Sequence, residues 1–273
     1  MPPATSTAIT SRYGPWALVT GASDGIGRAF AQHLAREGLH LVLVARREDV
    51  LASLARDLHR DHGVECRVIA MDLAPADSAR RLDEATRDID VGLIVASAGF
   101  GTSGELIGAD LGNEMDMVDV NCRAVLAQAA LFGPRLAKRQ RGGMVFLSSL
   151  LAFQGTPRAA NYAATKAYVQ TLAEGLRVEW AAHGVDVIAS APGPIGTGFA
   201  ARARMNMAQT LPPTVVARDT MAALGRRTTV RPGWLSKLLG WSLAILPRWG
   251  QVMVITEVMK GMTQHQHADS KRA

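Results

Sequence analysis

Short apolar runs alternate with amphipathic segments along most of the chain. The runs are rich in Val, Leu, Ile and Ala, which favours strands buried on both faces of a sheet. They cover residues 16–20, 39–45, 64–71, 91–96, 144–148 and 185–190. Segments with helical periodicity lie between them, one ending near residue 37 and others at about 48–62, 75–87, 113–139 and 160–182. This alternation predicts an α/β fold with a doubly wound parallel sheet and helices on both faces.

Nothing in the sequence divides the chain before about residue 198, since it shows no internal repeat, linker or shift in composition. We therefore expect one domain over 14–263, after a flexible N-terminus at 1–13 and before a disordered polar tail at 264–273. The pair Gly133-Pro134 predicts a kink near the end of the long helix at 113–139.

The last third of the predicted domain lies on the substrate side. Residues 198–211 are expected to form a lid, in which Met205 and Met207 either meet an apolar substrate or fill a helix interface. A helix with Thr214 as a plausible N-cap and a short seventh strand at 228–230 come next. A helical C-terminal extension is then expected at 233–263.

Composition is that of a soluble globular protein, with 48% hydrophobic and 20% charged residues among 273. The net charge of +6 is compatible with nucleic acid, a membrane surface or a polyphosphate ligand. No zinc-ligand spacing, RNA-binding signature or long basic run occurs, so we expect neither nucleic acid nor a metal. The sequence lacks a secretory signal pattern and a run of 18 apolar residues, which predicts a cytoplasmic protein.

A serine, a tyrosine and a lysine form the first candidate for chemistry. Tyr162 and Lys166 are four residues apart in a predicted helix, so their side chains leave the same face. An ammonium group near a phenol lowers the phenol pKa. Ser149, which follows the strand at 144–148, can place its hydroxyl beside the phenol. Together the three predict a proton donor or acceptor for carbonyl–alcohol interconversion.

A glycine-rich turn predicts a dinucleotide site. Gly21, Gly25 and Gly27 follow a strand and open a helix, whose N-terminal N–H groups favour a pyrophosphate. The tip of the second strand carries Arg46 rather than a carboxylate, which favours the 2′-phosphate of NADP(H) over NAD(H). Asp24, inside the turn, is less favourable to that phosphate.

Residues 14–230 resemble the short-chain dehydrogenase/reductase family in the order and spacing of their motifs. The matching motifs are Thr20-Gly21-xxx-Gly25-Ile26-Gly27, Asp72, Asn121, Ser149, Tyr162-xxx-Lys166 and Pro192-Gly193-Pro194-Ile195-Gly196-Thr197. The resemblance implies a Rossmann-type sheet of about seven strands in the order 3-2-1-4-5-6-7. It also implies a homodimer or homotetramer that pairs through the helices at 113–139 and 160–182.

The resemblance assigns roles to the matching residues. Tyr162 would be the general acid/base, and Ser149 would orient the substrate oxygen. Lys166 would bind the nicotinamide ribose and lower the phenol pKa, and Asn121 would hold a water on a proton relay. The implied cofactor-binding set is Gly21, Ser23, Asp24, Gly25, Ile26, Gly27, Arg46, Asp72, Leu73, Ala98, Gly99, Asn121, Tyr162, Lys166, Pro192, Gly193, Ile195 and Thr197.

One motif departs from the family pattern. The family has Asn-Asn-Ala-Gly after the fourth strand, whereas this chain has Ala96-Ser97-Ala98-Gly99. Because neither Ala96 nor Ser97 supplies the asparagine amide that braces neighbouring strands, we expect weaker support of the central sheet with activity intact.

These features favour an NADP(H)-dependent oxidoreductase acting on a ketone, aldehyde or alcohol of medium to large apolar character. A 3-oxoacyl-thioester reductase is the alternative, with Arg202, Arg204, Arg226 and Arg227 available to an acidic carrier or coenzyme A phosphate. A non-catalytic, membrane-docked NADP-binding protein is the alternative from another class. The Trp-rich segment 233–249 fits the pocket, a subunit contact or a peripheral membrane contact, which would make the protein membrane-associated.

Overall fold

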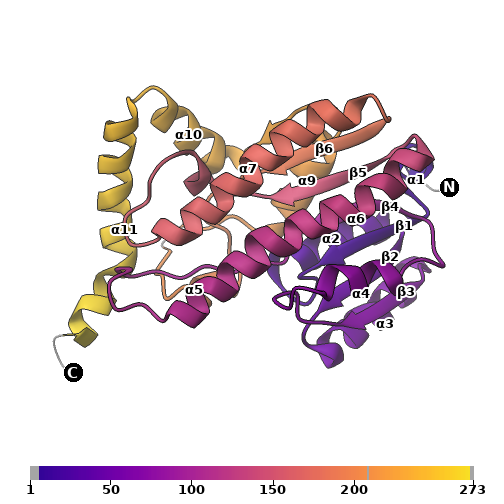
Figure 1. Ribbon diagram of the computed structural model, residues 1–273, viewed down its shortest axis with the longest axis horizontal. Helices are drawn as coiled ribbons and strands as arrows, with labels where there is room; N and C mark the ends of the chain where they lie inside the picture. The colour runs from indigo at the N-terminus through magenta and orange to yellow at the C-terminus, as the bar shows by residue number, and fades with distance from the viewer. Residues whose placement is uncertain (1–5, 208, 271–273) are drawn as a thin grey trace.

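The sheet of the computed structural model is entirely parallel (Figure 1). The structure describes residues 6–207 and 209–270. Within them the strand order is β3-β2-β1-β4-β5-β6-β7, which confirms the predicted fold and order. The strands are β1 (Trp16–Thr20), β2 (His40–Ala45), β3 (Cys66–Ala70), β4 (Val91–Ala96), β5 (Gly142–Leu147), β6 (Val185–Ser190) and β7 (Thr229–Val230).

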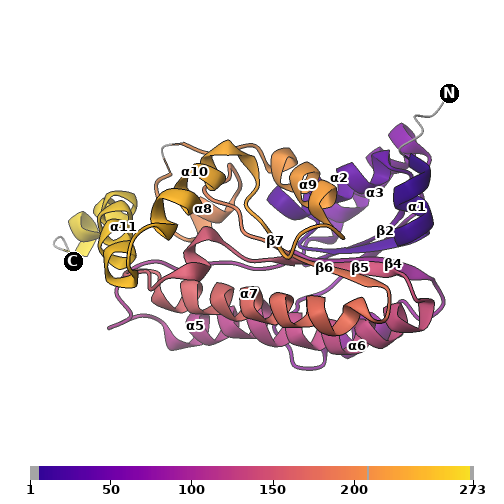
Figure 2. The same cartoon turned by 90° about the horizontal axis from the view of Figure 1, so that it is seen from above.

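Helices cover both faces of this sheet (Figure 2). One face carries α2 (Gly25–Arg36), α3 (Glu48–His62) and α9 (Pro213–Ala223). The other carries α4 (Ser78–Glu84), α6 (Ala124–Arg139) and α7 (Ala160–Ala181).

Alternate residues of each strand explain this three-layer arrangement, because successive side chains of a strand point to opposite faces. In β1, Ala17 and Val19 pack in the core beneath α2, while Leu18 packs in the core beneath α6 and α7. All three are fully buried. Since all strands run in one direction, their carboxyl ends meet at one edge, where a doubly wound sheet places its ligand.

The end of β1 is joined to the end of β4 by side-chain hydrogen bonds. Ser97 donates its hydroxyl to the carbonyl of Thr20, and the backbone N–H groups of Ser97 and Ala98 each donate to Thr20 Oγ1 at 3.1 Å. Ser97 thus joins the two strands through its hydroxyl and its backbone N–H, although it does not supply the asparagine amide of the family motif. The expected weaker support of the central sheet stays a prediction.

The N-terminal prediction is wrong over residues 6–13, which form helix α1 (Ser6–Tyr13) instead of a flexible segment. Tyr13 is buried and donates its hydroxyl to Asp186 Oδ2 at 2.7 Å, and Arg12 pairs with the same carboxylate. The helix is therefore held against the start of β6. The first part of the predicted flexible segment, residues 1–5, lies outside the described residues.

The C-terminal tail prediction is also wrong over 264–270, because α11 (Arg248–Ser270) continues through these residues. Gln266 Nε2 donates to Ser103 Oγ at 2.8 Å and to the Arg204 carbonyl at 2.7 Å. These bonds hold the last turns of α11 against the loop after β4 and the predicted lid. Residues 271–273 lie outside the described residues.

The long helix predicted at 113–139 consists of α5 (Leu111–Val118), the π-helical turn η1 (Asp119–Arg123) and α6, which continues through Gly133-Pro134. The kink predicted at that pair stays a prediction. The N-cap prediction is wrong, because Thr214 lies inside α9, whose N-cap is Pro212 without a side-chain hydrogen bond. Pro213, the first residue of α9, has the fixed backbone angle that favours the start of a helix.

The bridge between β1 and β4 leads to a testable prediction. Replacing Ser97→Ala removes the hydroxyl that satisfies the Thr20 carbonyl, so the free energy of unfolding should fall by about 1–2 kcal/mol. Chemical denaturation of both proteins measures this change. The matched control is Ser53→Ala on the exposed side of α3, which should alter stability by less than about 0.5 kcal/mol. Equal free energies of unfolding for wild type and Ser97→Ala would show that the bridge does not contribute to stability.

Candidate active site

A cavity of about 530 Å³ lies at the carboxyl edge of the sheet. The loops after β1, β2, β4, β5 and β6 form its floor, and α8 (Phe199–Arg202), α10 (Gly233–Ala244) and α11 contribute to its other walls. The site residues predicted from the sequence line this cavity, with the exception of Asn121. The structure thus brings together side chains that are up to 176 positions apart, from Gly21 to Thr197, when counted along the printed sequence.

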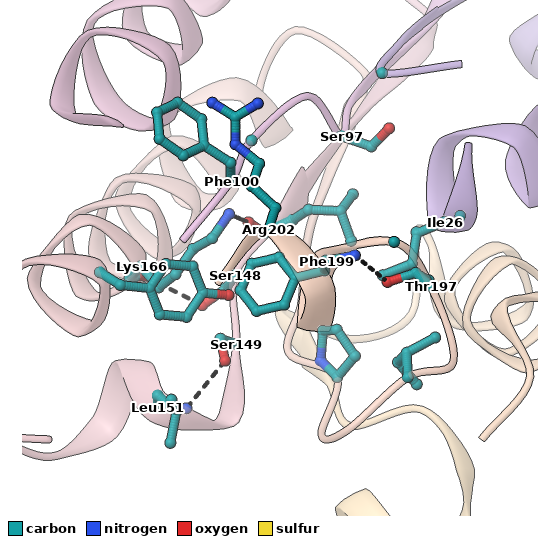
Figure 3. Close-up of a pocket in the computed structure, with 18 of the residues that line it drawn as sticks. Ile26, Ser97, Phe100, Ser148, Ser149, Leu151, Lys166, Thr197, Phe199 and Arg202 are labelled. Atoms are coloured by element: carbon teal, nitrogen blue, oxygen red, sulfur yellow. Dashed lines mark hydrogen bonds between the residues drawn. The ribbon is translucent and has the colours of Figure 1, made fainter. Parts of the chain in front are cut away.

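Ser149, Tyr162 and Lys166 meet where β5 ends beside α7. Ser149 is the N-cap of the short helix η2 (Leu150–Phe153), and its Oγ accepts from the Leu151 N–H at 3.2 Å (Figure 3). The same hydroxyl is hydrogen-bonded to the buried phenol of Tyr162. Lys166 Nζ donates to the Leu147 carbonyl at 2.8 Å and lies 5.8 Å from the centre of the tyrosine ring.

Burial dominates the electrostatics of this group. It raises the pKa of Tyr162 to about 12, although the hydrogen bond with Ser149 acts in the opposite direction. It lowers the pKa of Lys166 to about 8. The pKa of Tyr162 is thus raised rather than lowered, contrary to the prediction, because burial disfavours the charged phenolate. At neutral pH the phenol holds its proton and can donate it.

Asn121 lies behind the cavity wall, in the π-helical turn η1. Its side chain bonds Phe100 twice, accepting from the backbone N–H at 3.1 Å and donating to the carbonyl at 2.9 Å. It also donates to Thr165 Oγ1 at 3.0 Å, and that hydroxyl donates to the Tyr162 carbonyl. A π turn inserted in an α-helix is frequent at functional sites. Here it aims the amide between the loop after β4 and the helix of Tyr162.

The glycine turn after β1 has the shape of a phosphate cradle. Gly21 and Gly25 have positive φ angles of 69° and 53°, which favour glycine. A Cβ on Gly27 would lie 2.3 Å from the Gly21 carbonyl oxygen, and one on Gly25 would lie 2.8 Å from Thr197 Cγ2. Asp24 caps α2 through Gly25 N at 2.7 Å. The turn therefore fits a pyrophosphate at the N-terminus of α2.

Two arginines stand at the end of β2. Arg46 and Arg47 both line the cavity, and both are exposed. Arg47 donates to Ser23 Oγ at 3.2 Å, which links it to the glycine turn. Sequence reasoning singled out Arg46 and treated the following arginine only as its neighbour. The hydrogen bond shows that both side chains belong to this end of the cavity.

Comparison with known proteins identifies the family. A profile described as short chain dehydrogenase matches residues 15–208. The chain belongs to the short-chain dehydrogenase family. This is a family of oxidoreductases that use a nicotinamide cofactor.

Relatives with stated activities match most of this short-chain dehydrogenase. A 7β-hydroxysteroid dehydrogenase of Clostridium sardiniense is 34% identical, with 83% of this chain and 88% of the relative covered. A human "inactive hydroxysteroid dehydrogenase-like protein 1" is 30% identical, with 88% and 75% covered. A very-long-chain 3-oxoacyl-CoA reductase of Anas platyrhynchos is 28% identical, with 88% and 78% covered.

Two solved structures are similar over nearly their whole length. A 7β-hydroxysteroid dehydrogenase has a TM-score of 0.84 at 25% identity, covering 90% of this chain and 98% of its own. A short-chain dehydrogenase from Sphingobium yanoikuyae in complex with NADPH has a TM-score of 0.77 at 26% identity, with 86% and 97% covered.

The predicted lid contributes two side chains of α8 to the cavity. Arg202, which the sequence offered only to an acidic carrier, lies in it with its guanidinium 3.9 Å from the centre of the Phe100 ring (Figure 3). Burial, with the nearby charge of Arg46, lowers the pKa of Arg202. Sequence reasoning missed Phe199, which packs against the Tyr162 ring at 5.3 Å between ring centres. The sequence places residues 198–211 on a lid, but only the folded chain shows which of their side chains turn inward.

The C-terminal helices also contribute directly to the cavity. Ser236 of α10 is fully buried, and its Oγ accepts from the Gly193 N–H at 2.9 Å. The loop after β6 is thereby fastened to the C-terminal extension. Met205 and Met207 line the cavity as well, so the lid methionines face the candidate substrate space.

The lowered pKa of Lys166 leads to a pH-dependent stability. An unfolded lysine titrates near ~10.4, so between pH 8 and pH 10 the unfolded chain binds more protons at this position than the folded chain. The free energy of unfolding of wild type, relative to Lys166→Met, should therefore rise by about 2 kcal/mol across this window. Denaturant titrations at pH 8, 9 and 10 measure the difference. A difference that stays constant or falls contradicts the buried ammonium.

Proposed function

We propose that this short-chain dehydrogenase is an NADP(H)-dependent oxidoreductase that interconverts a ketone or aldehyde and an alcohol on a medium-to-large apolar substrate. The observation that supports this most strongly is the buried group of Ser149, Tyr162 and Lys166 at the edge of one cavity that also contains the glycine turn. The proton donor and the proposed dinucleotide site therefore line the same cavity. Carbonyl reduction requires this, because the proton and the hydride go to one carbonyl group.

Each of the three side chains has a distinct part in the proposed reaction. Bound NADPH supplies the hydride. Tyr162, whose phenol is protonated at neutral pH, donates its proton to the oxygen of the carbonyl substrate and takes one back in the reverse direction. Ser149, already hydrogen-bonded to that phenol, orients the same oxygen. The Lys166 ammonium holds positive charge beside the phenolate that proton transfer leaves.

The remaining predicted residues would hold the cofactor. The turn with Gly21, Gly25 and Gly27 would receive the pyrophosphate, and the loop with Pro192 and Thr197 would flank the nicotinamide. The other residues assigned to this role also line the cavity: Ser23, Asp24, Ile26, Asp72, Leu73, Ala98, Gly99, Gly193 and Ile195. Asn121 would act from behind Gly99. A Cβ atom added to Gly99 would lie 2.8 Å from Asn121 Oδ1 and 3.4 Å from Lys166 Nζ.

Arg46 and Arg47 support NADP(H) over NAD(H). Two guanidinium groups at the end of β2 offer several donors to a 2′-phosphate, and no carboxylate precedes Glu48 at this strand end. The NADPH complex of the related Sphingobium enzyme is consistent with this choice.

An apolar substrate is supported by the apolar side chains that line the cavity. Leu150, Leu151, Met205, Met207 and Leu243 are among them. The substrates named for the relatives, hydroxysteroids and very-long-chain 3-oxoacyl-CoA, both contain a large apolar group. We favour a hydrophobic cyclic or acyl ketone as the substrate class.

Reduction of a 3-oxoacyl thioester is the second candidate, supported by the 3-oxoacyl-CoA reductase relative. Arg202 lies in the cavity, as a phosphate-bearing carrier would need, whereas Arg226 and Arg227 are exposed outside its lining. A non-catalytic role finds less support, although one relative is described as inactive, because the Ser149, Tyr162 and Lys166 group is complete in this chain.

Pairing of subunits through the long helices is supported by exposed apolar side chains on them. Leu126 of α6 and Tyr168 and Val178 of α7 are 44%, 40% and 78% exposed. We propose that a second copy covers these residues in a homodimer or homotetramer.

The catalytic role of Tyr162 is tested by Tyr162→Phe. Without the hydroxyl the substrate oxygen has no proton donor, so kcat for an apolar ketone such as a keto-steroid should fall by at least about a hundredfold. NADPH affinity, followed by fluorescence, should change by less than about threefold. The matched control is Tyr168→Phe on the exposed side of the same helix, which should retain wild-type kcat. Undiminished turnover by Tyr162→Phe would refute the mechanism.

The cofactor preference is tested by the double substitution Arg46→Ser and Arg47→Ser. Loss of charged donors to the 2′-phosphate should raise the Kd for NADPH by about tenfold or more and leave the Kd for NADH nearly unchanged. Arg80→Ser on the exposed face of α4 serves as the control for lost positive charge. An equal loss of affinity for NADPH and NADH would mean that the two arginines do not bind the 2′-phosphate.

A further inference from the structure

Helix α10 buries small residues and exposes large apolar ones, which is the reverse of the usual pattern in a water-soluble protein. Its buried positions hold the small residues Ser236 and Gly240. Its large apolar side chains face outward, with Trp234, Trp241 and Ile245 65%, 67% and 68% exposed. Trp234, Leu238, Trp241 and Ile245 are spaced three or four residues apart and therefore share one face of the helix.

The exposed apolar surface continues onto the first turns of α11. Trp249 is 69% exposed and Met253 is 61% exposed. We define the docking face as Trp234, Leu238, Trp241, Ile245, Trp249 and Met253. The two helices that carry it lie at the end of the molecule farthest from the N-terminus (Figures 1 and 2). Clustered apolar exposure of this kind marks an interaction site rather than ordinary surface.

The substrate cavity and the docking face share the same two helices. Leu239 of α10 and Val254 and Val258 of α11 line the cavity. Leu239 and Val254 directly follow Leu238 and Met253 of the docking face in the sequence. One wall of the cavity therefore belongs to the helices that carry the docking face.

Charge indicates what covers the docking face. Between Asp219 and Glu257 the sequence carries no acidic residue. Lys237 and Arg248, both exposed, lie within this stretch beside the tryptophans. Tryptophan together with cations favours the interfacial region of an anionic bilayer.

A second copy of the chain is a poorer occupant of this face. A two-fold contact through it would place Lys237 and Arg248 of both copies in one interface, and the segment offers no carboxylate to neutralise them. Among the described residues, every helix is too short or too polar to cross a bilayer. The docking face would therefore lie on a membrane without spanning it.

We propose that the docking face rests in the interface of an anionic lipid bilayer and opens the substrate cavity to the lipid, so that apolar substrates enter from the membrane. The route of entry rests on the proposed function, whereas docking itself is independent of catalysis. Helices α10 and α11 thus provide both the membrane contact and the entrance to the substrate cavity.

Co-sedimentation of the full chain with vesicles tests the docking. Wild type should bind vesicles of three parts phosphatidylcholine to one part phosphatidylglycerol, and Trp241→Ser combined with Ile245→Ser should weaken this binding at least tenfold. Lys237→Gln combined with Arg248→Gln should remove the preference for the anionic vesicles over pure phosphatidylcholine. The control Leu111→Ser, which removes a 73% exposed apolar side chain outside both the docking face and the proposed subunit contact, should bind like wild type.

The competing outcomes separate the occupants and the two proposals. Equal vesicle binding by wild type and the Trp241/Ile245 variant overturns the docking. A wild type that ignores vesicles, together with a variant of lower mass by light scattering, assigns the face to a second copy and also overturns it. Unchanged circular dichroism melting of the variant shows that it is folded. These readouts need no turnover, so they stand even where the proposed reaction fails.

Entry of substrate from the membrane is tested by comparing a ketone dissolved in vesicles with a ketone dissolved in water. For a ketone dissolved in anionic vesicles, the Trp241/Ile245 variant should lose at least tenfold in turnover. For a small water-soluble ketone without vesicles, it should match wild type. Equal loss with both substrates, or no loss with either, contradicts entry from the membrane.

Discussion

The active site depends on the anchoring of α7 to the end of β5. Lys166 Nζ donates to the Leu147 carbonyl at 2.8 Å, and the Ser148 hydroxyl donates to the Lys166 carbonyl at 3.2 Å. These two bonds fix the rotation of α7, which places Tyr162 one turn away, next to Ser149. Because all of these groups are buried, the same contacts that set the geometry also set the protonation states. Burial raises the phenol pKa and lowers the ammonium pKa.

Much of this architecture is predictable because its signals are local. Runs of Val, Leu and Ile indicate strands that are buried on both faces. The glycines after β1 indicate a tight turn, and at Gly27 the backbone of Gly21 leaves no room for a side chain. The spacing of Tyr162 and Lys166 on one helix gives their common face without knowledge of the fold. The sheet edge then brings Ser149 to them, as the parallel strand order requires.

Other features depend on contacts between distant segments, which the sequence pattern does not encode. The polar stretch near residue 266 is helical because Gln266 bonds Ser103 and the Arg204 carbonyl. Residues before Gly14 are helical because Tyr13 reaches Asp186. The pKa of Tyr162 departs from the prediction for a similar reason: sequence spacing reveals the nearby ammonium but not the depth of burial. Likewise, the sequence leaves open whether the Trp-rich segment 233–249 contacts the pocket, a subunit or a membrane, whereas the fold shows that Trp234 and Trp241 face outward.

We propose that one cavity holds both the buried phenol of Tyr162 and the reactive end of a nicotinamide cofactor. A crystal structure of the chain with NADPH measures this most directly. We predict the pyrophosphate at the Gly21–Gly27 turn, the 2′-phosphate beside Arg46 and Arg47, and the Tyr162 hydroxyl facing the hydride-bearing carbon of the nicotinamide. A cofactor bound elsewhere, or a Tyr162 hydroxyl directed away from that carbon, would contradict the account.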